Sequence, residues 1–215
     1  CSCCSSARRT RGRPESAPRS AAAERNGGDA AVSNEMLALE QRCAGCQKCR
    51  LGATRTNLVF GVGPVPSPVV FVGEGPGQQE DLKGEPFVGP AGKLLDDMLS
   101  IIDLSRENSY ICNIVKCRPP QNRDPMEDEQ DACIGYLYEQ LKLLQPKVIV
   151  CLGRIAAMRL IKPDFRITRE HGNWSERNGV LYTAIYHPSA LLRDPTKRPE
   201  TFADLLEIRK RVRYF

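Results

Sequence analysis

Four short apolar runs, separated by longer segments of helical character, constrain the fold of this chain more than any other feature. The runs are rich in Val and Ile and cover residues 68–73, 110–116, 147–152 and 180–186. Their length and β-branched content are typical of buried strands. Helical patterns separate them, notably over residues 91–102 and 126–144. This alternation predicts an α/β fold, a three-layer α/β/α sandwich around a central, mainly parallel four-stranded sheet.

Ligands of such sheets bind beyond the carboxyl ends of the strands. The four runs end in GEGPG, NIVKCRPPQNR, CLGR and HPS, which begin at Gly73, Asn113, Cys151 and His187. A single polar residue at the end of a strand is more often structural than functional. Three of these four ends carry unusual polar groups, however, and their convergence on one rim of the sheet favours a shared site.

The loop after the first run combines glycines, carboxylates and one aromatic ring: Gly73, Gly75, Gly77, Glu74, Glu80, Asp81 and Phe87. The glycines let the backbone approach a ligand closely, and Phe87 offers a stacking face. The loop lacks the G-x-x-x-x-G-K-[ST] pattern, and its carboxylates would repel phosphate. It therefore favours a neutral ring or a developing cation as its ligand.

Length and charge limit the classes of function. The chain has 215 residues, enough for one domain and a tail, and no apolar run approaches the roughly 20 residues that span a bilayer. Of the net charge of +5, residues 1–34 contribute six Arg against three acidic residues, or +3, which leaves about +2 for the rest. We expect a soluble, intracellular (cytoplasmic) monomer. Any nucleic-acid site must be a local patch, with candidates Lys116, Arg118 and Arg123, or Arg193, Lys197, Arg198, Arg209, Lys210, Arg211 and Arg213.

Residues 1–34 are rich in Ser, Ala, Arg and Gly and show no apolar periodicity. Such a segment cannot offset the entropy of ordering by burial. The sequence therefore predicts a disordered basic tail over residues 1–34 and a folded domain over residues 35–215. An Arg- and Ser-rich start is also typical of an organelle transit peptide, although Glu15 and Glu24 argue against that interpretation.

Ten cysteines in a chain expected to be intracellular favour metal ligation over a disulfide framework. Cys43, Cys46 and Cys49 form two overlapping C-x-x-C units, and Cys117 and Cys133 follow near the second strand. Four thiolates could hold zinc or a 4Fe-4S cluster, and spacing does not separate the two. Arg118, next to Cys117, would offset thiolate charge and slightly favours iron. Cys112 and Cys151, inside apolar runs, are expected to be small buried apolar residues.

These motifs together resemble the family 4 uracil-DNA glycosylases, the iron-sulfur branch of their superfamily, from Cys46 to the C-terminus. The resemblance rests on four ordered elements: CQKCRLGATRTNLVFGVG from Cys46, GEGPG with the later PFVG, NIVKCRPPQNR from Asn113, and HPS from His187. The resemblance selects Cys46 and Cys49, rather than Cys43, as the metal ligands of this segment. The resemblance thus implies a 4Fe-4S cluster held by Cys46, Cys49, Cys117 and Cys133.

The activity that this resemblance implies is hydrolysis of the N-glycosidic bond of uracil in single- and double-stranded DNA, after base flipping, to leave an abasic site. The implied uracil-binding residues are Gly73, Glu74, Gly75, Phe87, Asn113 and His187. The implied catalytic residues are Glu74, Glu80, His187 and Asn122, with the choice between the two glutamates for orienting water left open. Residues expected to contact DNA are Arg118, Arg123, Ser189, Leu191, Leu192 and Arg193, with Leu191 or Leu192 as a wedge in the base stack.

Two alternative functions are neither of them glycosylase activity. A sister branch traps uracil DNA covalently, but it has Gln where Gly75 stands and an inserted basic loop ending in His, neither of which occurs here. A non-turnover iron-sulfur sensor of uracil in DNA is therefore the weaker alternative. The other is a zinc-stabilised nucleotide-binding module of unrelated function.

Overall fold

A single five-stranded sheet organises the protein. The computed structural model describes residues 20–215, with side chains from residue 30 onward. The strands are β1 (Val69–Gly73), β2 (Tyr110–Asn113), β3 (Val148–Leu152), β4 (Trp174–Arg177) and β5 (Val180–Ile185), in the spatial order β2-β1-β3-β5-β4. All neighbours pair in parallel except β4 and β5. The α/β class with a mainly parallel sheet is confirmed, but the predicted count of four strands was one too low.

The missing strand is β4, which forms an antiparallel hairpin with β5 at one edge of the sheet. Asn178 and Gly179 connect the two strands and both have positive φ, 52° and 77°. Positive φ at both residues is the backbone conformation that a tight two-residue hairpin turn requires, and Asn-Gly adopts it readily. Trp174 and Ser175 are partly buried and the next two residues are exposed, so β4 presents no apolar run.

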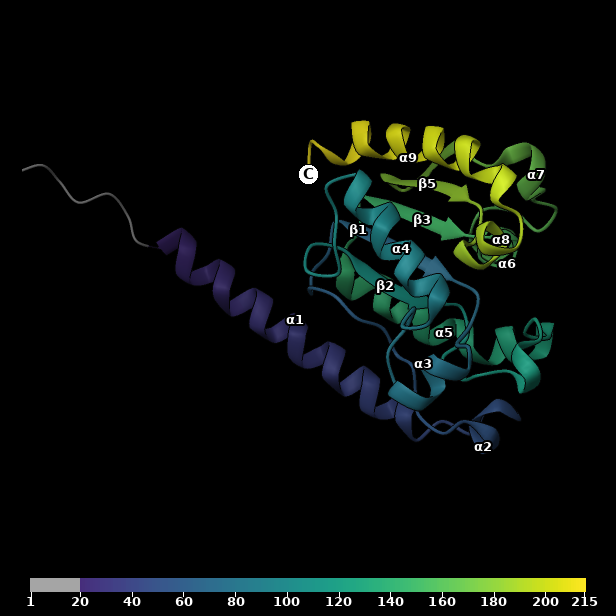
Figure 1. Ribbon diagram of the computed structural model, residues 1–215. Coiled ribbons are helices and arrows are strands. Elements are labelled where there is room, and N and C mark those ends of the chain that lie inside the picture. The colour runs from purple at the N-terminus through teal and green to yellow at the C-terminus, as the bar shows by residue number, and fades with distance from the viewer. Residues whose placement is uncertain (1–19) are drawn as a thin grey trace, which may run out of the picture.

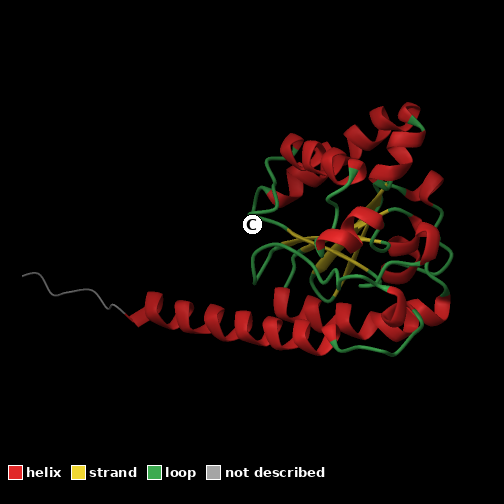
Figure 2. Cartoon of the chain, turned by 60° about the horizontal axis from the view of Figure 1, so that its bottom comes forward, coloured by secondary structure: helices red, strands yellow, loops and turns green. Residues whose placement is uncertain are grey.

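Helices make up the two outer layers. They are α1 (Ser20–Ala44), α2 (Leu51–Thr54), α3 (Gln78–Lys83), α4 (Pro90–Ile101), α5 (Glu127–Leu144), α6 (Arg154–Leu160), α7 (Ile167–Glu170), α8 (Pro188–Arg193) and α9 (Arg198–Val212), with 3-10 turns η1 (Pro120–Asn122) and η2 (Pro195–Lys197). Figure 1 shows α4 in front of the sheet and α9 along its top. In Figure 2 the strands lie between helices above and below.

Alternate residues of each strand face two separate apolar clusters. Val70, Val72 and Ile149 belong to the cluster that includes residues of α1, α5 and α6. Phe71 and Val150 belong to the other, which includes residues of α4, α8 and α9. Both faces of the sheet are therefore covered, which explains why the parallel strands read as continuous apolar runs. The predicted three layers are present.

The outer edge of β2 is also paired. Val62 and Ile111 form an isolated antiparallel bridge, in which each backbone N–H donates to the other's carbonyl, at 2.9 Å from Val62 and 2.8 Å from Ile111. The chain before β1 thus covers the edge that β2 would otherwise expose.

Helix α1 begins at Ser20, upstream of the predicted domain start at residue 35. Residues 1–19, including most of the predicted tail, lie outside the described residues, and the division of the chain at residue 34 stays a prediction. Cys112 and Cys151 are fully buried, as expected of small apolar residues. Across the part of the chain that the structure describes, no helix is both long enough and apolar enough to cross a membrane.

Candidate active site

A cavity of about 640 Å³ lies where the strand ends converge. It is lined by residues that follow β1, β2 and β5, so Asn113 and His187 share one cavity although 74 positions separate them in sequence. Most of the residues expected to bind uracil, act in catalysis or contact DNA line it: Glu74, Gly75, Glu80, Phe87, Asn113, Asn122, Arg123, His187, Ser189 and Arg193.

Asn113 is placed by strand pairing. It is the last residue of β2 and lies opposite Gly73, the last residue of β1. Its side chain is buried, and its Oδ1 atom has no hydrogen-bond partner within the described residues. A Cβ atom on Gly73 would come within 2.4 Å of that oxygen and 2.6 Å of Phe87 Cζ. Gly73 therefore makes room for the amide and the ring, and the amide oxygen is a buried acceptor without a partner in a residue that lines the cavity.

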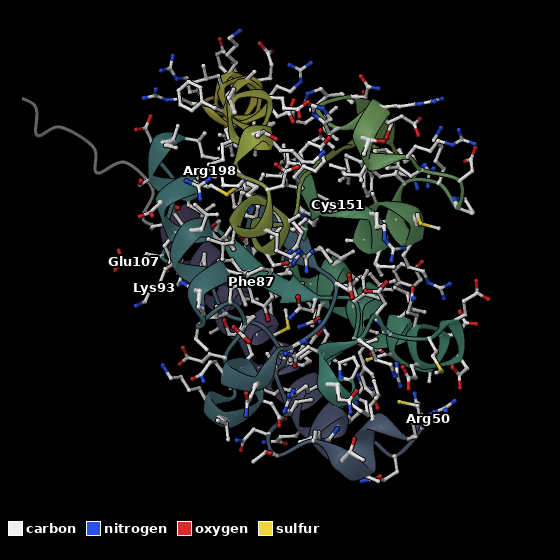
Figure 3. The ribbon with its side chains drawn as sticks, turned by 45° about the vertical axis from the view of Figure 1, so that its right-hand side comes forward. Arg50, Phe87, Lys93, Glu107, Cys151 and Arg198 are labelled. Carbon is white, nitrogen blue, oxygen red and sulfur yellow. The ribbon has the colours of Figure 1, made fainter. Side chains whose placement is uncertain are left out.

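Phe87 sits on a tightly held loop, near the middle of the molecule in Figure 3. Glu80 Oε1 accepts hydrogen bonds from the backbone N–H groups of Val88 and Gly89, both at 2.9 Å. Arg106 donates to the carbonyls of Pro86, at 2.9 Å, and Phe87. These bonds hold Phe87 at a φ of 54°, which a non-glycine residue rarely adopts. Glu80 thus anchors the loop that carries the ring.

His187 presents a defined tautomer to the cavity. It is the N-cap of α8, and its Nδ1 atom accepts the backbone N–H of Ser189 at 3.2 Å, with Ser189 Oγ at 2.7 Å. Because a backbone N–H can only donate, Nδ1 carries no proton and Nε2 does in the neutral ring. Burial and the nearby Arg193 lower the pKa of His187 to about 4. His187 is therefore a neutral N–H donor, and its ring lies 5.5 Å from that of Phe87.

Glu74 lies beside a second carboxyl group that sequence reasoning missed. Burial, followed by the charge of Asp124, raises the pKa of Glu74 to about 7, whereas Arg154 and Arg193 act in the opposite direction. Asp124 and Arg154 form an ion pair and both line the cavity. The sequence position of both residues could have predicted their place at the cavity, since Asp124 directly follows the NIVKCRPPQNR element and Arg154 ends CLGR.

The residues expected to contact DNA differ in their availability. Leu192 is 41% exposed, whereas Leu191 is 2% exposed and packs in the core below α8. The structure thus contradicts Leu191 as a wedge, because neighbouring helix positions point to different sides. Arg193 is exposed, whereas Arg123 makes a two-point ion pair with the buried Glu129, at 2.8 and 2.6 Å.

A second cavity is lined by five thiols: Cys43, Cys46, Cys49, Cys117 and Cys133. The first three come from the end of α1 and the loop after it, Cys117 follows β2, and Cys133 lies on α5. All five are free. The structure thus brings together the four cysteines predicted as ligands, with Cys43 as a fifth.

The donor set of this second cavity suits a soft metal group. Within residues 30–215, no three His, Cys, Asp or Glu side chains converge closely enough to coordinate one ion. Arg55 donates from Nη1 to Cys117 Sγ at 3.0 Å, and the backbone N–H of Lys116 points to Cys133 Sγ at 3.4 Å. The guanidinium beside Cys117 is therefore that of Arg55, whereas Arg118, predicted for this role, donates to Asn122.

Comparison with known proteins agrees with this geometry. The family model of the uracil DNA glycosylase superfamily matches residues 60–210. The type-4 uracil-DNA glycosylase of Archaeoglobus fulgidus is 50% identical over 173 residues, 76% of this chain and 86% of that protein. The type-4 enzyme of Thermotoga maritima is 44% identical over 74% of this chain and 84% of its own length. A type-5 uracil-DNA glycosylase of Pyrobaculum aerophilum is 36% identical over 45% of this chain and 44% of its own. The chain belongs to the uracil DNA glycosylase superfamily and is a uracil-DNA glycosylase of the type-4 family.

Proposed function

We propose that this glycosylase hydrolyses the N-glycosidic bond of uracil in both single- and double-stranded DNA, after flipping the nucleotide into the 640 Å³ cavity, and leaves an abasic site. The observation that carries the proposal is the convergence of Asn113, Phe87, His187 and Glu74 on that one cavity. An amide, an aromatic ring, a neutral N–H donor and a carboxyl group are the groups that excision of a neutral pyrimidine requires.

Asn113 discriminates uracil by the polarity of its amide. Its unpartnered Oδ1 accepts uracil N3–H, and its NH₂ group donates to O4. Cytosine reverses this polarity, because its exocyclic amine donates where uracil accepts. An unpaired buried polar group costs about 1–3 kcal/mol, so this amide alone supplies roughly tenfold or greater discrimination. The Phe87 ring occupies the space that the missing side chain of Gly73 leaves, and from there it stacks on the base.

His187 and Glu74 divide the chemistry of bond cleavage. Departure of uracil develops negative charge on the base and positive charge on the sugar. The Nε2–H group of His187 donates to uracil O2 and stabilises the leaving base. Glu74, as a carboxylate, orients the attacking water and balances the sugar's charge. Glu80 is less suited to this task because its Oε1 already binds the loop after Phe87, and Asn122 supports the neighbouring loop through Arg118.

The product is an intact strand with an abasic site. Nicking by the glycosylase itself would need an amine nucleophile that forms a Schiff base. No lysine is among the described residues that line the cavity. Arg193, which lines the cavity, holds the backbone, and the exposed Leu192, which precedes it in α8, fills the gap left by the flipped base.

Cys46, Cys49, Cys117 and Cys133 would hold a 4Fe-4S cluster, with Cys43 beside it. When bound, the cluster supplies a structural cross-link between the α1–α2 loop, the segment after β2 and α5, because neither uracil departure nor water addition is a redox reaction. Measuring iron and acid-labile sulfide checks the cluster, with about four of each expected per chain. Thiolate ligation and a DNA substrate both suit an intracellular, cytoplasmic enzyme. One chain supplies every site residue, as expected for a monomer.

The direct test uses purified protein and uracil-containing oligonucleotides, single-stranded and duplex, analysed with and without hot alkali. We expect strand breaks only after alkali and several turnovers per enzyme. A thymine-containing oligonucleotide is the matched control. Absence of alkali-labile product at stoichiometric enzyme would refute the activity, and product limited to one per enzyme would favour a uracil sensor that does not turn over.

A further inference from the structure

Lys116 is a fully buried lysine between the two cavities. Its side chain is 0% exposed, and its ammonium donates to the backbone carbonyl of Asn113 at 2.8 Å. The ring of Phe60 lies 5.8 Å from Nζ. Within residues 30–215, no carboxylate lies within ion-pair distance of this ammonium. A buried charge without a counter-charge is costly, so the structure must supply negative charge by another route.

The groups that can supply this negative charge are the thiols of the cysteine cavity, once they are ionised by a bound metal group. Lys116 lines this cavity together with the five thiols. Its backbone N–H also points to Cys133 Sγ, at 3.4 Å. Thiolates bound to a metal group would therefore compensate the ammonium.

The other end of the same short segment belongs to the uracil pocket. Residues 113–117 run from the uracil-reading amide of Asn113 to the thiol of Cys117. Ile114 N–H donates to the carbonyl of Gly73 at 2.9 Å, and Val115 N–H donates to that of Glu74 at 3.2 Å. Movement of this segment would therefore displace the amide and the loop that carries Glu74.

We propose that Lys116 is a positioning residue that couples the two cavities: the thiolate-ligated cluster compensates its charge, and its ammonium in turn fixes the backbone at Asn113. This inference rests on the proposed function, because it concerns the amide that reads uracil. It makes uracil recognition depend on the cluster although the cluster takes no part in the chemistry.

The first test compares Lys116→Met with Lys48→Met. Lys48 lines the same cavity, but its ammonium lies over the ring of Tyr136 at 4.6 Å and donates nothing to Asn113. We expect Lys116→Met to lose iron during purification and to bind free uracil about tenfold more weakly in calorimetry, as loss of one positioning hydrogen bond predicts. For Lys116→Met we also expect the KM for uracil DNA to rise by a larger factor than the kcat falls. Lys48→Met keeps the wild-type uracil affinity.

The inference is overturned if Lys116→Met binds uracil as tightly as Lys48→Met does, with or without its iron. Should Lys116→Met fail to fold, the wild-type holoprotein provides the second test. A ligand stabilises the state that it binds, so saturating uracil must slow the loss of iron to a chelator, by about threefold or more, whereas adenine must not. Equal rates of iron loss with uracil and adenine overturn the coupling.

Uracil excision by the same wild-type preparation separates the two proposals. If the protein excises uracil but uracil does not change the rate of iron loss, the role proposed for Lys116 is refuted and the proposed function stands. No excision removes the proposed function, whatever the iron measurements show.

Discussion

At the scale of single residues, His187 is the group that the fold prepares most completely. Ser189 binds its Nδ1 atom from the same turn of α8, and burial keeps the ring neutral. A neutral imidazole whose proton is already on Nε2 needs no rearrangement before it donates to a developing anion. Preorganised donors of this kind are among the largest contributors to catalysis.

Replacing His187 with Ala should therefore slow single-turnover excision of uracil by two to three decades, about 2.7–4 kcal/mol, the usual effect of losing one such donor. The matched control is His171→Gln, since His171 is the other histidine and bonds Asp204 and Glu200 of α9 rather than lining the cavity. Rapid-quench kinetics measure both rates. Equal rates for His187→Ala and His171→Gln would remove His187 from the mechanism.

Glu74 should set the pH dependence of the reaction. Its pKa is raised to about 7 by burial first and Asp124 second, and the mechanism uses its carboxylate. The value of kcat/KM should therefore rise with pH through about 7 and reach a plateau above it, because kcat/KM reports the ionisation of the free enzyme. His187, with a pKa near 4, stays neutral across this range.

The substitution Glu74→Gln should abolish that rise and leave a low, flat profile between pH 6 and 8. Asp124→Asn should move the rise to lower pH, because it removes the neighbouring charge that raises the pKa of Glu74. A wild-type profile that is flat over this range would exclude Glu74 as the ionising group.

Sequence reasoning could predict that most of the residues lining the cavity lie together, because strand ends converge in any parallel sheet. It could not decide between Leu191 and Leu192, since only the packing of α8 shows which leucine enters the core. It also assigned the cation beside Cys117 to Arg118, its neighbour in sequence, whereas the fold brings Arg55 there from a distant segment. Long-range contacts of this kind leave no periodic signal.

At the scale of elements, the loop between α3 and α4 shows how closely this protein packs around Phe87. A Cβ atom on Gly92, in the first turn of α4, would lie 1.8 Å from the carbonyl oxygen of Phe87. Helix α4 therefore approaches the loop as closely as a backbone without a side chain allows. The position of the stacking ring is thus set by α4 as well as by Glu80.

Gly92→Ala should destabilise the protein by about 1–3 kcal/mol, as overpacking does, and raise KM by displacing Phe87. The matched control is Gly135→Ala on α5, where an added Cβ meets nothing within 4 Å. That change should instead stabilise by about 0.5–1 kcal/mol through helix propensity. Chemical denaturation compares the two, and equal effects of both substitutions would contradict the close approach.

Strand β4 shows what apolar patterning cannot find. Its sequence, WSER, has two partly buried and two exposed residues at the edge of the sheet and contains no apolar run. The Asn178-Gly179 pair before β5 was the available signal, because it favours a tight hairpin turn. The buried parallel strands were predicted correctly because both of their faces are covered.

At the scale of the whole molecule, charged residues of both signs line the cavity: Glu74, Glu80, Asp124, Arg123, Arg154 and Arg193. The net charge is only +5, and several exposed arginines, such as Arg42, Arg50 and Arg154, are paired with acidic residues. Arg193 lies at the cavity without an ion pair to any described residue. Its charge remains available to a DNA phosphate.

Arg193→Ala should weaken DNA binding almost equally for all sequences and lower the slope of log K against log salt by about 1. Arg209→Ala is the control, because Arg209 pairs with Asp103 at 2.6 Å and does not line the cavity. Fluorescence anisotropy across a salt series measures both slopes. An unchanged slope for Arg193→Ala would show that this guanidinium does not contact phosphate.

The two borders of the sheet, one bridged and one formed by a short polar strand, have a consequence for handling the protein. An uncovered strand border is a template on which a second molecule can add its own strand, the first step toward fibrils and insoluble aggregates. Here the Val62–Ile111 bridge occupies one border, and the short polar β4 forms the other. Substituting Val62 with Pro, which removes the N–H that it donates to Ile111, would turn a storable solution into one that forms precipitate at high concentration.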